Sequence, residues 1–315
     1  MRRGLGLALL LCAGTAAADD NDLVLSSLGT RITDGGGNLT GVVGDAIAFR
    51  LLASQLGTVL APHLLGPAET NGFSGFQLTV DYSNTTIDRG AAYWRALEGP
   101  APASMSTVGF FVRKGLWLPV PSFEIGAGAV HLVDSHTWAA QLYAKLALNE
   151  GYHDLPLPSL AVRGAVSRMM SQRELDLTIA SLDVSVSKHV GIGGTWRLDP
   201  YGGWDLLMIV PRSQVIDPTP NVDTLLPANA NLPNTNFVFL DESNIIRNKL
   251  FLGAKLQYDI FELTLEGALT LAGTSVDGNE GTSTPCTPMT TTASCAAQDT
   301  AKLQRTLAMS AGFDF

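Results

Sequence analysis

The sequence alternates apolar and polar residues with a period of two over much of its length, and this pattern constrains the fold more than any other feature. The final stretch shows it best, because one face is apolar except for Arg305 while the other face is polar. The apolar face carries Leu303, Leu307, Met309, Ala311, Phe313 and Phe315. Successive side chains of a strand point to opposite faces, so the pattern predicts strands that separate an apolar from a polar environment.

Ten segments show this alternation. They lie at about 73–87, 104–114, 121–133, 136–149, 158–170, 173–187, 196–212, 236–258, 260–272 and 301–315. Within 173–187 the apolar residues move from odd to even positions after Ile179. A β-bulge near Ala180 and Ser181 would absorb this shift, because a bulge adds one residue to one strand.

Composition indicates where the apolar residues lie. Of the 315 residues 46% are hydrophobic and 16% charged, against about 25% charged in an ordinary soluble domain. The best candidate for a membrane-spanning helix, Leu51 to Ala68, is interrupted by two prolines and three polar residues, whereas such a helix needs about 20 apolar residues. The net charge of −9 argues against nucleic acid as a partner.

Two further patterns favour a barrel in lipid over a soluble sandwich. The connections alternate in length, with long polar ones at 87–103, 213–235 and 273–300 and shorter ones between them, as in outer-membrane barrels. Aromatic residues also gather near predicted strand ends, where a membrane meets water. These pairs are Trp117 with Phe123, Tyr258 with Phe261, and Phe313 with Phe315.

The N-terminus has the layout of a secretory signal peptide. Arg2 and Arg3 precede an apolar run from Leu5 to Leu11, and three alanines end at Ala18. We expect cleavage after Ala18. The predicted organisation is therefore a signal peptide at 1–18, an N-terminal periplasmic or plug segment at 19–72, and a barrel at 73–315.

The end of the chain resembles the assembly signature of Gram-negative outer-membrane β-barrels. The residues that carry the resemblance are Leu307, Met309, Ala311, Phe313 and the terminal Phe315. Asp199-Pro200-Tyr201-Gly202-Gly203 is similar to the strand openings of such proteins. The resemblance implies an outer-membrane location, with membrane lipid and the barrel-assembly machinery as partners. An apolar stretch before the first strand is also similar to long-chain fatty acid transporters of the FadL type.

The predicted fold is all-β, a transmembrane antiparallel up-and-down β-barrel of about 10–12 strands with a short N-terminal helical or plug segment. Residues 45–61 carry one apolar stripe at helical spacing. A plug or gate inside the barrel would use such a helix. A short periplasmic helix on the barrel rim, or two additional strands, would also fit the pattern.

The polar faces supply the candidate site, because they line the lumen if the apolar faces meet lipid. The lumen-lining candidates are Asp81, Lys145, Arg163, Asp176, Asp183, Arg197, Asp199, Asp205, Lys255, Glu262 and Glu266. They fit a hydrophilic passage with a mild cation preference. They fit equally an internal salt-bridge network that fills a narrow barrel.

The remaining motifs point to structure rather than chemistry. Cys286 and Cys295 flank a polar stretch, and in an exported protein we expect them to form a disulfide. No histidine lies near either cysteine, so we expect no metal site there and no cofactor. Asp134-Ser135-His136 offers three catalytic residue types, but sequence neighbours rarely point at one another, and no hydrolase motif is present.

We therefore expect a protein that is not an enzyme. The favoured function is a passive channel or transporter for small or hydrophobic solutes. The alternative is a non-transporting, structural or adhesin-like barrel whose external loops bind a partner. An outer-membrane hydrolase is the third and weakest hypothesis.

Overall fold

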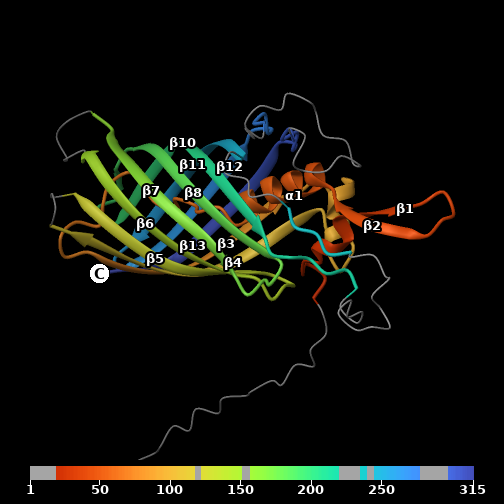
Figure 1. The fold of residues 1–315 in the computed structure, drawn as a ribbon. Coiled ribbons are helices and arrows are strands. Elements are labelled where there is room, and N and C mark those ends of the chain that lie inside the picture. The colour runs from red at the N-terminus through yellow and green to blue at the C-terminus, as the bar shows by residue number, and fades with distance from the viewer. Residues whose placement is uncertain (1–18, 118–121, 151–156, 220–234, 240–244, 277–296) are drawn as a thin grey trace, which may run out of the picture.

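A computed structural model describes residues 19–117, 122–150, 157–219, 235–239, 245–276 and 297–315. Ten antiparallel strands form most of it (Figure 1). They are β3 (Phe76–Thr86), β4 (Ser104–Leu116), β5 (Phe123–Leu132), β6 (Trp138–Asn149), β7 (Ser159–Met170), β8 (Leu175–Ser187), β10 (Trp196–Ser213), β11 (Ile245–Tyr258), β12 (Phe261–Thr270) and β13 (Gln304–Asp314).

These strands close into a ring. Each pairs with its neighbours in chain order, and β13 pairs with β3 to seal the seam. The predicted up-and-down barrel is confirmed, and the number of barrel strands is ten. The short strand β9 (Val190–Ile192) extends one turn by pairing with the start of β10.

The residues before the barrel form four small elements. They are a 3-10 helix η1 (Leu25–Leu28), a hairpin of β1 (Gly29–Thr33) and β2 (Leu39–Gly44), and an α-helix α1 (Ala46–Val59). A second 3-10 helix, η2 (Ala92–Ala96), lies in the connection after β3. Within the described ranges, no helix has the length and apolar character needed to cross a membrane.

The two ends of the barrel differ. At the end that holds the C-terminus, here called the C-terminal end, the strands are joined by the turns 117–122, 150–158, 188–195 and 259–260. The opposite end, here called the loop end, carries the connections 87–103, 133–137, 171–174, 214–244 and 271–303. The longest connections of the barrel therefore all lie at the loop end, as the sequence predicts.

The outer surface is an apolar belt. Its exposed side chains include Val80, Phe110, Leu142, Val184, Leu252, Leu265 and Leu307. Aromatic rings pair around the C-terminal end, with Trp196 on Tyr258 (4.6 Å between ring centroids) and Phe261 on Phe313 (5.3 Å). Rings at this level are typical of a membrane–water interface. Of the residues carrying the assembly resemblance, Leu307, Met309, Phe313 and Phe315 all face outward.

Strand β8 corrects one prediction. It pairs with β7 and β10 without a break through Ala180 and Ser181, so the predicted β-bulge is wrong. The apparent phase slip arises because Leu175, Leu177 and Ile179 point inward and are buried, whereas Asp176 lies on the outer face. The inner face is thus apolar near the loop end and polar further along.

Two predictions lie outside the described residues. These are the signal peptide at 1–18 and the disulfide between Cys286 and Cys295.

The outward face makes a testable prediction about the membrane. Leu265 is half exposed near the middle of β12, so we expect Leu265→Arg to lower the free energy of unfolding by about 2–4 kcal/mol, because it places a cation in hydrocarbon. Urea unfolding in lipid vesicles measures this. Leu303→Arg, at the loop-end edge of the belt, is the matched control and should cost about 0–1 kcal/mol. Equal costs at both positions would contradict the assigned belt.

Candidate functional site

Helix α1 fills the mouth of the barrel at the loop end. Asp45 caps its N-terminus by accepting a hydrogen bond from the Ala48 N–H at 3.0 Å. Leu52 is fully buried in a cluster that includes Leu177 of β8 and Ile209 of β10. Because α1 also contacts β3, β4 and β11, it has barrel wall on several sides and lies inside the ring.

Polar groups bind the same helix to the loop-end connections. Ser54 donates to Asp299 at 2.8 Å and accepts from Arg247 of β11 at 2.7 Å. Gln55 accepts from the Asp88 N–H at 3.0 Å. The helix is therefore fixed by apolar packing and by bonds to three different parts of the chain.

Residues 60–75, here called the lumen segment, run from α1 through the barrel to β3. They form no helix or strand, yet most of 60–68 are buried. Their carbonyl groups accept hydrogen bonds from side chains of β6, β7 and β11. The bonds are Gln141 Nε2 to Leu60 O (3.1 Å), Lys249 Nζ to Pro62 O (2.9 Å), Arg163 Nη1 to His63 O (2.7 Å) and Lys145 Nζ to Glu69 O (2.9 Å).

The amide groups of the lumen segment are bonded in the same way. Three of them donate to side chains of β12, β8 and β5. The bonds are Leu65 N to Glu266 Oε2 (3.0 Å), Ala68 N to Ser187 Oγ (3.0 Å) and Asn71 N to Glu124 Oε2 (2.9 Å). Since the partner strands lie all around the ring, the lumen segment follows the barrel axis.

Around the segment, the wall charges are paired. The buried ion pairs are Arg163–Asp183 (2.6 Å), Lys255–Glu262 (2.6 Å), Lys249–Asp205 (2.7 Å), Lys145–Glu124 (3.1 Å) and Arg113–Asp81 (3.5 Å). His63 of the lumen segment lies 3.5 Å from Glu266. Removing one member of such a pair would leave an uncompensated buried charge, which costs about 3–5 kcal/mol.

The predicted lumen residues fall into three groups. Buried inside the barrel are Asp81, Lys145, Arg163, Asp183, Asp199, Asp205, Lys255, Glu262 and Glu266. Arg197 is partly exposed near the C-terminal end, where it binds Asp199 and Glu69. Asp176 is the exception, because it lies outside and pairs with Arg168 at 2.7 Å.

Four buried charged residues of the wall are absent from the predicted set. They are Arg113, Glu124, Arg247 and Lys249. Strict alternation would have found them, since each stands next to an outward apolar residue in its own strand, as Lys249 does beside Leu250.

Two small cavities lie beside the lumen segment in the described part of the chain. A cavity of about 20 Å³ lies between His63, Asp81 and Gln141, and another of about 10 Å³ lies beside Arg113 and Glu124. Cavities of this size hold about one water molecule each. A solute could pass these points only after the lumen segment has moved.

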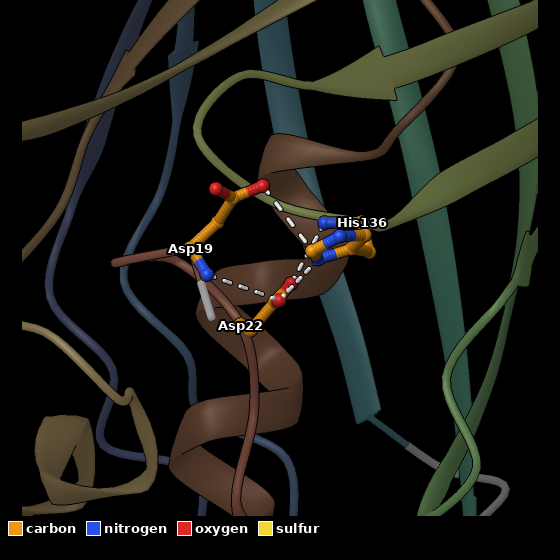
Figure 2. Close-up of side chains that lie close together, drawn as sticks. All are labelled: Asp19, Asp22 and His136. Atoms are coloured by element: carbon orange, nitrogen blue, oxygen red, sulfur yellow. Dashed lines mark hydrogen bonds and ion pairs between the residues drawn. The ribbon is translucent and has the colours of Figure 1, made fainter. Parts of the chain in front are cut away.

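A second cluster fixes the N-terminal residues at the loop end. Figure 2 shows Asp19 and Asp22 beside His136, which lies in the turn between β5 and β6. Asp22 accepts from the His136 N–H at 2.7 Å and from the Ser135 hydroxyl at 2.8 Å, and its second oxygen lies 2.6 Å from His136 Nδ1. The three residues could supply a metal with three donor atoms, but these hydrogen bonds already account for their proximity.

The same turn holds the only catalytic combination that the sequence offered. Ser135 donates to Asp22 and its oxygen lies 2.8 Å from the Thr137 hydroxyl, and His136 is bonded to Asp22. Serine and histidine are therefore joined through the carboxylate, whereas a serine hydrolase needs its histidine base to contact the serine nucleophile directly.

Comparison with known proteins returns similarities in fold alone. No protein-family model matches the chain, and no curated protein matches it. The attachment invasion locus protein Ail of Yersinia pestis is 10% identical over 77% of this chain and 99% of its own, with a TM-score of 0.29. Neisserial surface protein A is 11% identical over 76% and 94%, with a TM-score of 0.28. An outer membrane channel of Pseudomonas putida F1 is 12% identical over 79% and 98%, with a TM-score of 0.37.

The barrel itself decides the class. A closed antiparallel ring with an apolar belt, an aromatic rim and a polar interior is built to span a membrane without exposing any strand edge. This chain is a membrane-spanning β-barrel of the outer-membrane type, as the sequence predicts.

The Asp22–His136 contact makes a prediction about pH. The hydrogen bond and charge of Asp22 raise the pKa of His136 above 6.5. Partial burial raises the pKa of Asp22, but its hydrogen bonds to His136 and Ser135 outweigh burial and leave it below 3.8. The contact is therefore charged on both sides between the lowered pKa of Asp22 and the raised pKa of His136. It weakens as the pH rises through the pKa of His136, and it is lost in acid as Asp22 is protonated.

An NMR titration of the His136 ring measures its pKa, which sets the upper end of the pH range in which the contact is charged. We expect a midpoint above 6.5 in the wild type and a return toward 6.5 in Asp22→Asn. The same midpoint in both proteins would show that Asp22 does not hold His136.

Proposed function

We propose that the protein is a gated channel for small polar solutes, closed by its own lumen segment. The observation that carries this proposal is the way the segment is held. Below Ala61 its main chain is bonded to polar wall side chains, such as Lys145 and Glu266, and its apolar packing is confined to two small clusters around Leu64 and Ala68. Water can replace bonds of this kind when the segment moves.

The two halves of the plug differ in the cost of moving them. Pulling α1 from the mouth would expose Phe49, Leu52, Leu56 and Val59 of the main apolar cluster, which costs about 1.5–3 kcal/mol for each side chain. Below Ala61 the lumen segment buries only two large apolar side chains, Leu64 and Leu65, and is held otherwise by hydrogen bonds. A hydrogen bond exchanged for one to water costs only about 0.5–1.5 kcal/mol. We therefore assign α1 as the anchor and the lumen segment as the gate.

Once the segment is displaced, the wall charges would line the pathway. Six basic residues then face seven acidic ones. They are Arg113, Lys145, Arg163, Arg247, Lys249 and Lys255, and Asp81, Glu124, Asp183, Asp199, Asp205, Glu262 and Glu266. Rings of mixed charge suit small hydrophilic solutes and discriminate weakly by sign.

The second candidate is a non-transporting barrel that presents its loop end to a partner. The bonds that join the N-terminal residues to several loop-end connections favour it, because they order that surface. Neither candidate includes a catalytic step. For both we propose that the C-terminal strand β13 is the part recognised by the barrel-assembly machinery.

A reversible cross-link tests the channel. The Ala68 N–H lies 3.0 Å from Ser187 Oγ, so cysteines at these two positions should form a disulfide that ties the lumen segment to β8. The variant is made with Cys12→Ser, Cys286→Ser and Cys295→Ser, so that only the new cysteines react. In planar bilayers we expect the oxidised protein to lose at least about 90% of the ion conductance, and reduction to restore it.

Ala68→Cys alone, in the same background, is the matched control and should conduct equally under both conditions. Equal conductance of the oxidised and reduced double variant would show that the lumen segment is not the gate. A folded barrel without conductance in either form would overturn the channel and favour the non-transporting candidate.

A further inference from the structure

The two termini of the described chain lie at opposite ends of the barrel. With an even number of strands, β3 begins where β13 ends, and Phe76 and Phe315 exchange two backbone hydrogen bonds there, of 2.9 and 2.8 Å. The lumen segment then takes the chain back along the barrel axis, so everything before α1 lies at the loop end (Figure 1).

The lumen segment is long enough to cross a membrane. Its sixteen residues, 60–75, reach about 50 Å when extended, and the hydrocarbon core of a bilayer is about 30 Å thick. The segment bends at several residues and turns at Gly72–Gly75, yet its bonds to the wall begin at Leu60 and continue to Asn71.

At the loop end the chain is fixed to three connections. The Asn21 N–H donates to Asp134 O at 2.9 Å, the Val24 N–H to Ala96 O at 2.7 Å, and the Leu25 N–H to Glu174 at 2.6 Å. The hairpin of β1 and β2 follows and projects away from the barrel (Figure 1). Its tip around Gly35 is exposed.

We propose that the protein carries its own N-terminal segment, residues 19–45, through its lumen and displays the β1–β2 hairpin on the cell surface. Outer-membrane barrels keep short turns on the periplasmic side and long loops outside. Here the short turns share an end with the C-terminus, and the hairpin shares an end with the long connections. Residues 19–45 cross the membrane before the seam between β3 and β13 closes around the lumen segment, or by sliding through the closed ring.

This proposal does not depend on the channel. A lumen segment that never moves would display the hairpin just as well, and a conducting barrel of inverted orientation would hide it.

Labelling of single cysteines on intact cells tests the display. Three variants are made in the Cys12→Ser/Cys286→Ser/Cys295→Ser background and treated with a maleimide coupled to a polymer too large to cross the outer membrane. Gly35→Cys reports on the hairpin, where an added Cβ meets no atom within 4 Å. Arg173→Cys marks the loop end, and Thr195→Cys marks the C-terminal end; both positions are exposed.

We expect Gly35→Cys and Arg173→Cys to be labelled on intact cells. We expect labelling of Thr195→Cys to increase at least about tenfold when the outer membrane is permeabilised. Labelling of Gly35→Cys only after permeabilisation would overturn the proposal. If Arg173→Cys then remained accessible, the N-terminal segment would lie in the periplasm and the path through the lumen would be wrong. If Arg173→Cys were protected as well, the orientation of the barrel would be wrong.

Discussion

The structure depends on one constraint, which is that main-chain N–H and C=O groups buried away from water must be hydrogen bonded. The barrel strands hydrogen bond their main-chain N–H and C=O groups to one another in the closed ring. The lumen segment has no secondary structure, so its groups depend on side chains of the wall, such as Lys145, Arg163 and Glu266. This need explains why the interior of the barrel is rich in long charged side chains.

The same constraint divides the lumen into two zones. Helix α1 bonds its own main chain, so the wall around it can be apolar, and Leu177 and Ile209 pack against it. Below the helix the wall becomes polar, and within β8 the change occurs between Ile179 and Asp183. A helix packed in the main apolar cluster, above a segment whose main chain is bonded to polar side chains, is the arrangement on which the proposed gating depends.

Sequence reasoning could find the barrel because each strand has one face in lipid, and period-two alternation records that directly. The predicted 260–272 and the observed β12 (Phe261–Thr270) show how closely it does so. It failed at Leu175–Ile179, because alternation cannot distinguish an apolar face in lipid from one that packs on an internal helix. Sequence reasoning could not predict the path of the lumen segment, since residues 60–75 have no periodicity and their partners lie on strands far away in the chain.

The central claim is that the lumen segment lies bonded inside the barrel, and amide hydrogen exchange tests it most directly. The Leu65, Ala68 and Asn71 amides donate to wall side chains, so we predict exchange at least about a hundredfold slower than in an unfolded chain. In Glu266→Leu, which removes the acceptor, protection of Leu65 should fall while that of Asn71 persists. Exchange of all three amides at unfolded rates, with β12 still protected, would contradict the account.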